Sequence, residues 1–288
     1  MAKKLKHTDW FDWVNLFILT ILMLLIVFPF YTTVTKSFMS QKEFTQRGLV
    51  FWPNDPILGN YESVLRSAIW RSFGVTGLYT ILGVIFSMFL TTTLGYGMSK
   101  KDWPGRRIVQ NLIVFTMYFG GGLIPFFLVV KQMGMIDTIW SVIIPTGLSV
   151  YNMIIMRTFF ESLPPDLEEA ATIDGASPPL IFIKVLLPLV TPALATLTLF
   201  YAVGKWNEWF YPSLFLINYK MWPIQLFLRQ VLEVNTASMD IPPEYQKQMF
   251  ADGVKAASVI VTMFPIMCVY PFLQKYFIKG IMIGAIKS

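Results

Sequence analysis

Residues 163–188 read LPPDLEEAATIDGASPPLIFIKVLLP, and they separate two uncharged runs that are each long enough to cross a membrane. The Pro164-Pro165 pair closes off the preceding run, because proline cannot continue a helix interior. Asp166 is expected as the N-cap of a short helix, with Glu169 three residues later in a capping-box-like arrangement. Gly175 is expected to end this helix in the left-handed conformation.

A second short helix is expected to begin directly after the glycine. Ser177 and Pro178 are typical of an N-cap and the first helical position that follows it. Small alanine side chains on the first helix would let another surface approach its backbone closely. The stretch therefore predicts two short helices joined by a glycine elbow, facing water at one end of a membrane bundle. Four residues are expected to share one face of the first helix: Leu167, Ala170, Ala171 and Asp174.

The composition indicates a membrane protein. The chain has 288 residues, of which 55% are hydrophobic and 14% are charged, whereas soluble domains are about 25% charged. The mean hydropathy is +0.57. Aromatic residues make up 16% of the chain, which fits amphipathic rings at bilayer interfaces. We attribute the net charge of +6 to basic residues that set membrane topology rather than to nucleic-acid binding.

The uncharged runs predict an all-α integral membrane protein with six transmembrane helices. Basic residues concentrate in the segments that this arrangement places inside, whereas the short loop on the other side carries only Lys131. Both termini are therefore expected in the cytoplasm. The predicted segments are a tail at 1–13, a transmembrane domain at 14–274 containing the loop 163–188, and a C-terminal tail at 275–288. The predicted spans are 14–35, 72–99, 108–130, 138–156, 185–204 and 256–274.

Two of these spans carry residues that disfavour a straight helix. Pro145 and Gly147 predict a kink in the fourth span. The third span contains the triplet Gly120-Gly121-Gly122, which helix propensity cannot explain. Either the helix breaks at the triplet to line a cavity, or a neighbouring helix needs the space. The sequence leaves these two explanations open.

Several functional classes are disfavoured by what the sequence lacks. The chain has one cysteine and one histidine, Cys268 and His7, so a His/Cys metal site is not expected. No cluster of His, Asp or Ser lies at a membrane face, and we expect no catalytic residue and no enzymatic role. The phosphate-binding pattern Gly-x4-Gly-Lys-Ser/Thr is missing as well. An ion-coupled transporter, the alternative function, would need charged residues near mid-membrane, and the six runs hold none.

Residues 163–188 resemble the EAA loop of permease subunits of ATP-binding-cassette importers. The resemblance rests on Glu169-Ala170-Ala171, then Asp174-Gly175-Ala176, then Leu187-Pro188. In that family the loop is a cytoplasmic coupling helix that docks into a groove on the ATPase subunit. The resemblance therefore implies the type I importer permease fold, with alternating access driven through residues 166–175. It assigns ATPase coupling to Asp166, Glu168, Glu169, Ala170, Ala171, Asp174 and Gly175.

The resemblance extends over nearly the whole chain. The chain resembles carbohydrate-importer permeases of the maltose-transporter type in stretches such as FTMYFGGGLIP (115–125) and LFYAVGKWNEWF (199–210). More narrowly, these stretches resemble the subgroup for oligosaccharides such as aldouronates. This implies oligosaccharide import across a bacterial cell membrane, with ATP and Mg²⁺ on a partner ATPase and no cofactor in this chain. The implied partners are a second related permease, two ATPase subunits, an extracellular sugar-binding protein and membrane lipid, without nucleic acid.

The resemblance also suggests a role for the C-terminal tail. In the maltose member of the family, the tail of the corresponding subunit reaches the interface between the ATPases. The tail of this chain reads YPFLQKYFIKGIMIGAIKS (270–288) and matches in place and character. The residues assigned to that interface are Gly280, Met282 and Gly284.

A candidate sugar contact follows the fifth predicted span. Its residues combine flat apolar rings, which suit the C–H faces of sugars, with groups that hydrogen-bond hydroxyls. An interfacial aromatic belt explains the same residues, so both interpretations stay open. Lys205 and Glu208 share a helix face at i, i+3 and are expected to pair. The candidate contact consists of Trp206, Asn207, Glu208, Trp209 and Tyr211.

Overall fold

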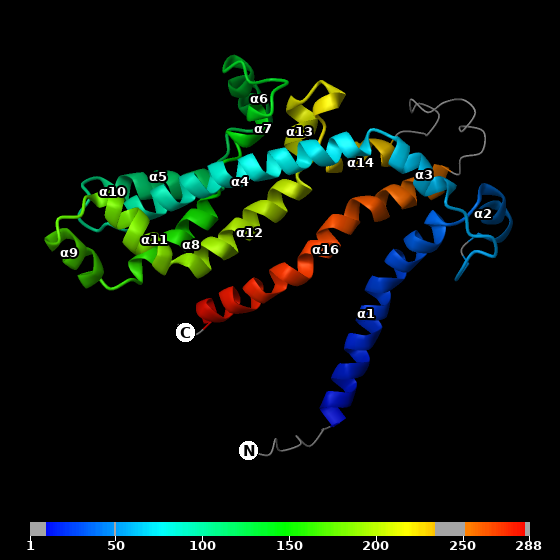
Figure 1. Ribbon diagram of the computed structural model, residues 1–288, viewed down its shortest axis with the longest axis horizontal. Coiled ribbons are helices and arrows are strands. Elements are labelled where there is room, and N and C mark those ends of the chain that lie inside the picture. Colours follow the sequence, from blue (N-terminus) through cyan, green and yellow to red (C-terminus); the bar gives the residue numbers. More distant parts are fainter. Residues whose placement is uncertain (1–9, 49, 234–250, 286–288) are drawn as a thin grey trace. The chain divides into compact units, whose positions relative to one another are not determined.

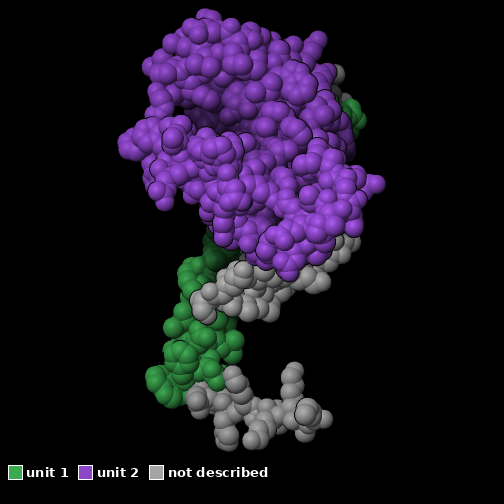
Figure 2. Space-filling view, turned by 90° about the vertical axis from the view of Figure 1, so that its left-hand side faces the viewer, with its two compact units in different colours: residues 1–69, 230–265 green, residues 70–229, 266–288 purple. Residues whose placement is uncertain are grey.

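The computed structural model describes residues 10–48, 50–233 and 251–285, and side chains only as far as Cys268 in the last segment (Figure 1). Every regular element in these ranges is a helix. The chain divides into two compact units, which are coloured separately in Figure 2. Unit 1 comprises residues 1–69 and 230–265, and unit 2 comprises residues 70–229 and 266–288.

Three helices in the described residues are long and apolar enough to cross a membrane: α1 (Trp10–Ser37), α4 (Ile69–Ser99) and the Ala251–Cys268 part of α16. The α16 helix runs from Ala251 to Ala285 without a break between the expected span and the expected tail. Gly280, Met282 and Gly284 therefore lie on helical backbone, and their side chains are outside the described residues.

Two helix pairs are long and apolar enough only when taken together, and each pair is sharply bent. The α5 helix (Arg106–Tyr118) and α6 (Leu123–Gln132) meet at 117°. A continuous helical segment formed by α10 (Pro178–Ile181), the π-helix η1 (Phe182–Leu186) and α11 (Leu187–Leu189) meets α12 (Thr191–Asn207) at 84°. If each pair is one span, the described residues hold five helical spans.

The glycine triplet coincides with the first of these bends. Gly122 is the N-cap of α6, with φ +87° and ψ 164°, a non-helical conformation that favours glycine. A Cβ added at Gly120 would meet no atom within 4 Å, and at Gly121 and Gly122 it would meet only Pro125 of the same segment. Of the two explanations for the triplet, the structure favours a helix break, since no other helix among the described residues contacts a Cβ placed there.

The expected continuous helix over 138–156 does not form. The α7 helix (Trp140–Ile143) is short, and α8 (Val150–Glu161) begins only after an irregular segment at 144–149. Gly147 lies in this segment, where an added Cβ would come within 2.5 Å of the Phe86 ring. The kink expected here is thus a complete interruption, because the chain must turn tightly against α4.

Unit 1 is organised by hydrogen bonds at the end of α1. Asn60, which is buried, donates through Nδ2 to the carbonyl oxygens of Ser37 and Met39, both at 3.0 Å. The Glu43 carboxylate accepts the backbone N–H of Asn54 at 2.8 Å. These bonds fix α2 (Gln41–Arg47) and α3 (Gly59–Arg66) close to α1.

Unit 2 is built around contacts among α4, α8 and α12. Tyr201 on α12 hydrogen-bonds Thr91 on α4 at 2.6 Å and accepts the backbone N–H of Ser149 at 3.0 Å, so one hydroxyl joins α4, α12 and the start of α8. Beyond α12 follow α13 (Phe210–Phe215), the 3-10 turn η2 (Tyr219–Met221) and α14 (Ile224–Glu233). The main apolar cluster consists of Met156, Phe160, Ile181, Leu186, Val190, Ala193 and Leu197.

Candidate functional site

The helix α9 (Asp166–Ile173) lies between α8 and α10 at one end of unit 2 (Figure 1). Its N-cap is Pro165, with φ −60° and ψ −31°, and no side chain caps the helix. The prediction that Asp166 is the N-cap is therefore wrong. Proline holds φ near the helical value, so the helix begins early, and Asp166 lacks the extended backbone that an N-cap needs. The acidic first turn still lies at the positive end of the helix dipole.

The other end of α9 forms as the sequence predicts. Gly175 has φ +79°. Its N–H donates to the Thr172 carbonyl, and the N–H of Ala176 donates to the Ala171 carbonyl, both at 3.0 Å. This pair of bonds is the Schellman motif. Ser177 then occupies the N-cap position of α10, although its side chain makes no capping bond.

The inner side of α9 is tied to the end of α4 through Glu168. One carboxylate oxygen accepts the Tyr96 hydroxyl at 2.9 Å, and the other accepts the Lys100 ammonium. The Lys100 nitrogen also lies 4.5 Å from the centre of the Tyr96 ring. These three groups, which we call the α9 tether, hold the short helix in place from residues far away in the sequence.

Apolar contacts support the tether. The rings of Tyr96, Phe160 and Phe182 lie 4.9 to 6.0 Å apart, so α4, α8 and η1 meet beneath α9. Ala171 and Ala176, on either side of the glycine, pack against the main apolar cluster of unit 2. The elbow thus packs one face against the protein core.

A second set of charged contacts joins α5 to α8 nearby. Arg106 pairs with Glu161, and its Nε donates to the Met98 carbonyl at 2.8 Å. Arg157 lies 3.4 Å from the same glutamate. The loop between α4 and α5 is therefore linked to the end of α8 as well as to α9.

The outer side of α9 exposes residues at i, i+3, i+4 and i+7. Ile173 is 86% exposed, an unusual position for a large apolar side chain. Within the predicted face, Ala171 is partly buried against the core whereas Ala170 is exposed. Sequence reasoning also missed Ile173, Tyr96 and Lys100. We call the outward set the α9 outer face: Asp166, Glu169, Ala170 and Ile173.

The seven residues that the sequence assigned to coupling thus fall into two groups. Glu168 and Ala171 face inward, where they position the helix. The remaining five are exposed: Asp166, Glu169, Ala170, Asp174 and Gly175.

The α9 tether gives a testable charge swap. Lys100→Glu and Glu168→Lys are each expected to lower the free energy of unfolding by less than about 1 kcal/mol. The effect is small because the Lys100 and Glu168 side chains are 38% and 33% exposed, so that solvent screens their attraction. The combined swap is expected to restore it, together with the substrate-stimulated ATP hydrolysis that the resemblance to importer permeases implies. Thermal unfolding and ATPase assays measure both effects.

The matched control combines Lys100→Glu with Glu169→Lys, which reverses the same charges on the wrong face. It should not restore the free energy of unfolding, which is the property compared here because Glu169 belongs to the α9 outer face. Equal rescue by both double variants would contradict the tether.

Comparison with known proteins connects this geometry to a family. Residues 83–283 match the family model described as "Binding-protein-dependent transport system inner membrane component". The chain belongs to this family. It is accordingly a permease component of a transport system rather than an enzyme, and it falls outside the ion-coupled class that the sequence left as an alternative.

Relatives and a solved structure agree with this assignment. The permease is 38% identical to Protein LplC of Bacillus subtilis (strain 168) over 96% of this chain and 95% of that protein. It is also 38% identical to the polygalacturonan/rhamnogalacturonan transport system permease protein YtcP of the same organism, over 96% and 98%. A chain in the crystal structure of a bacterial ABC transporter for the acidic polysaccharide alginate matches with TM-score 0.86 and 32% identity, over 96% and 100%.

The expected ion pair in this permease does not form among the described residues. Lys205 is buried, and its ammonium donates to the carbonyl oxygen of Thr146 at 3.1 Å and to its hydroxyl at 2.6 Å. Glu208 instead accepts the backbone N–H groups of Phe210 at 2.9 Å and Tyr211 at 3.2 Å. The reason is that α12 ends at Asn207, so the two side chains do not continue on one helix face.

The other candidate sugar-contact residues separate in the fold. Tyr211 packs between Phe126 and Phe215, with ring centres 5.6 and 6.1 Å away. Trp206 packs near Phe73, and its buried Nε1 has no hydrogen-bond partner within the described residues.

Asn207 and Trp209 remain at the surface. The amide oxygen of Asn207 accepts from Gln225 at 3.4 Å, and the Arg229 guanidinium lies 3.6 Å above the Trp209 ring. The structure therefore brings only part of the candidate set to one surface. Within the described residues, no group of three or more His, Cys, Asp or Glu side chains could hold a metal ion.

Proposed function

We propose that this permease imports oligosaccharides and that α9 is the helix through which a separate ATPase drives it. The observation that carries the proposal is the division of α9 into an inner side fixed to the core and an outer face whose residues are exposed. Such a helix passes an applied displacement to α4 and α8 because it moves with them as one body. In this proposal ATP and Mg²⁺ bind to the ATPase and not to this chain.

The substrate class is inferred from the relatives. YtcP is named for polygalacturonan and rhamnogalacturonan, and the solved transporter imports alginate. These substrates differ in their sugars but share the form of a chain of linked sugar rings. We therefore propose oligosaccharides as the cargo, carried by alternating access.

We infer that the α9 end of unit 2 and both termini face the bacterial cytoplasm. Support comes from basic residues in the loop that contacts α9: Lys100 and Arg106 pair with glutamates there, and Lys101 and Arg107 lie beside them. Basic loops of membrane proteins stay on the cytoplasmic side. The tail residues Gly280, Met282 and Gly284 would then reach the ATPases.

The proposed assembly contains a second related permease, two ATPase subunits and an extracellular sugar-binding protein. The family description, which names binding-protein-dependent transport, supports the last of these. For sugar contact, Asn207 and Trp209 are the members of the candidate set with exposed groups, whereas Trp206, Glu208 and Tyr211 would act by shaping the surface beneath them.

The test reverses the chemistry of the α9 outer face. The double variant Glu169→Arg/Ile173→Asp is expected to lose co-purification of the ATPase and uptake of labelled oligogalacturonides. Burial of Ile173 alone is worth about 2 kcal/mol, or about thirtyfold in affinity. Asp55→Arg, a charge reversal at an exposed site in unit 1, is the matched control and should behave like wild type.

Wild-type ATPase retention in the double variant would reject α9 as the coupling helix. If the wild-type complex retains the ATPase but takes up no oligosaccharide, the proposed cargo class is rejected instead.

A further inference from the structure

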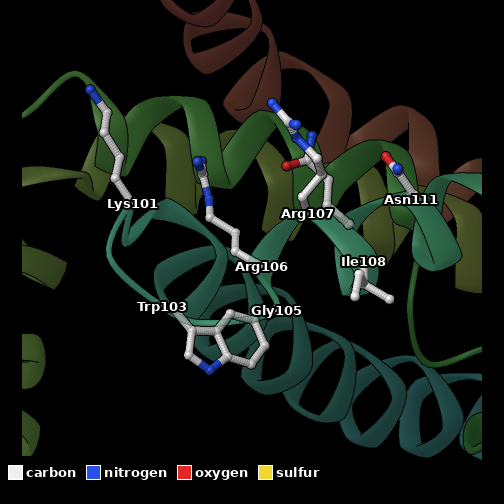
Figure 3. A pocket seen from close by; sticks show the side chains of 8 residues that line it. Lys101, Trp103, Gly105, Arg106, Arg107, Ile108 and Asn111 are labelled. Atoms are coloured by element: carbon white, nitrogen blue, oxygen red, sulfur yellow. The ribbon is translucent and has the colours of Figure 1, made fainter.

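A basic pocket lies in the loop between α4 and α5. It has a volume of about 760 Å³, within the range of small-molecule sites. Lys101, Arg106 and Arg107 line it together with Trp103 and Ile108. Figure 3 shows the nitrogen-bearing ends of the three cations on one side of the loop, and the Trp103 ring and Ile108 side chain on the other.

Within the described residues, the positive charge of this pocket is only partly neutralised. Its lining contains three cations and no carboxylate. Arg106 is engaged by Glu161, but Lys101 and Arg107 form no ion pair within the described residues, and both are exposed. Two cations that line one concave, polar site and form no ion pair among the described residues favour a ligand that carries a concentrated negative charge.

An apolar stripe continues from the pocket along α5. Ile108, Leu112 and Phe115 lie at i, i+4 and i+7 and are 67%, 59% and 53% exposed. Ile108 belongs to both the pocket and the stripe. The surface therefore changes from cationic to apolar along one helix, at the end of a segment long and apolar enough to enter the membrane together with α6.

We propose that this surface binds one anionic phospholipid, with its phosphate between Lys101 and Arg107 and its acyl chains along the stripe of Ile108, Leu112 and Phe115. Basic clusters beside membrane helices attract anionic headgroups, and tryptophan favours the headgroup level where Trp103 would lie. A soluble phosphate would use the cations but not the stripe. The combination of the two surfaces is what selects a lipid.

The site is connected to α9 through its own loop. Lys100, next to Lys101, belongs to the α9 tether, and Arg106 in the pocket wall pairs with Glu161 at the end of α8. A bound headgroup would limit the movement of this loop and would thereby hold α9, which Lys100 contacts, more firmly. The lipid is therefore expected to raise the efficiency with which ATP hydrolysis is coupled to transport, beyond any role in import itself.

The first experiment measures lipid retention by native mass spectrometry of the purified full chain in the complex in which it is isolated, titrated with phosphatidylglycerol or phosphatidylcholine. Lys101→Gln/Arg107→Gln is expected to weaken phosphatidylglycerol binding about 25-fold, at about fivefold per cation. Lys131→Gln/Lys220→Gln removes two exposed lysines elsewhere and should leave it unchanged. The charge-conserving variant Lys101→Arg/Arg107→Lys should also retain binding, which separates loss of charge from misfolding.

A second experiment distinguishes lipid from soluble anion. Leu112→Gln/Phe115→Gln should weaken phosphatidylglycerol binding, and millimolar inorganic phosphate should not displace the lipid. Three results would overturn the proposal: equal retention of both lipids, displacement by inorganic phosphate, or loss of the ATPase from Lys101→Gln/Arg107→Gln with lipid retention unchanged. The last result would identify the pocket as a protein-docking surface while leaving the proposed import function intact.

Discussion

Replacing Gly95 with leucine is expected to separate α4 from α8 and to abolish uptake. A Cβ at this position would lie 2.9 Å from Cγ and 3.1 Å from Cβ of Met156, and 3.3 Å from the backbone nitrogen of Arg157. The last contact is decisive, because a helix backbone cannot rotate away as a side chain can. Overpacking of this kind costs about 1–3 kcal/mol, and leucine adds three further carbons to the clash.

Gly97 provides the control on the same helix. A Cβ there meets no atom of the chain within 4 Å, so Gly97→Leu should keep both the unfolding temperature and uptake close to wild type. Thermal unfolding in detergent and uptake in cells measure the difference. A Gly95→Leu protein as stable and active as Gly97→Leu would show that α4 and α8 do not pack as described.

The second large effect is expected from Gly175→Val. Gly175 has φ +79°, a conformation that costs a non-glycine residue about 1–2 kcal/mol and that β-branched residues adopt least readily. The Schellman bonds at the end of α9 depend on it. We expect α9 to change direction, with at least a tenfold loss of uptake, while most of unit 2 stays folded.

Gly134 has the same local role at the end of α6, with φ +68° and open space around it. Gly134→Val therefore carries a comparable strain away from α9. The ratio of substrate-stimulated to basal ATP hydrolysis should fall for Gly175→Val and stay near wild type for Gly134→Val. Equal losses in both variants would mean that strain alone, and not the direction of α9, causes the defect.

Local sequence rules predicted the elbow well and its orientation poorly. Gly175 and the Ser177-Pro178 start are decided by neighbouring residues, and both form as expected. Glu168 and Glu169 look alike to any local rule. Their opposite roles depend on Tyr96, which is 72 residues from Glu168 in the sequence, and no pattern within the loop could reveal that contact.

The spans show a similar limit. Hydropathy identifies the run at 138–156 as apolar, but it does not report whether the backbone is continuous. The interruption at 144–149 is stabilised from another helix, since Lys205 on α12 binds both oxygen atoms of Thr146. The i, i+3 spacing of Lys205 and Glu208 suggested an ion pair. In the structure, the Lys205 ammonium instead satisfies the Thr146 carbonyl group, which lies in the break between α7 and α8.

The bend between α5 and α6 has a consequence for how the chain enters the membrane during its synthesis. The two helices have 13 and 10 residues, so at about 1.5 Å per residue neither reaches across a hydrocarbon layer of about 30 Å. If the insertion machinery released one helix at a time, neither helix alone would be long enough to stay inserted across the membrane. We therefore expect α5 and α6 to enter the membrane together, with the nascent chain bending at the three glycines between them.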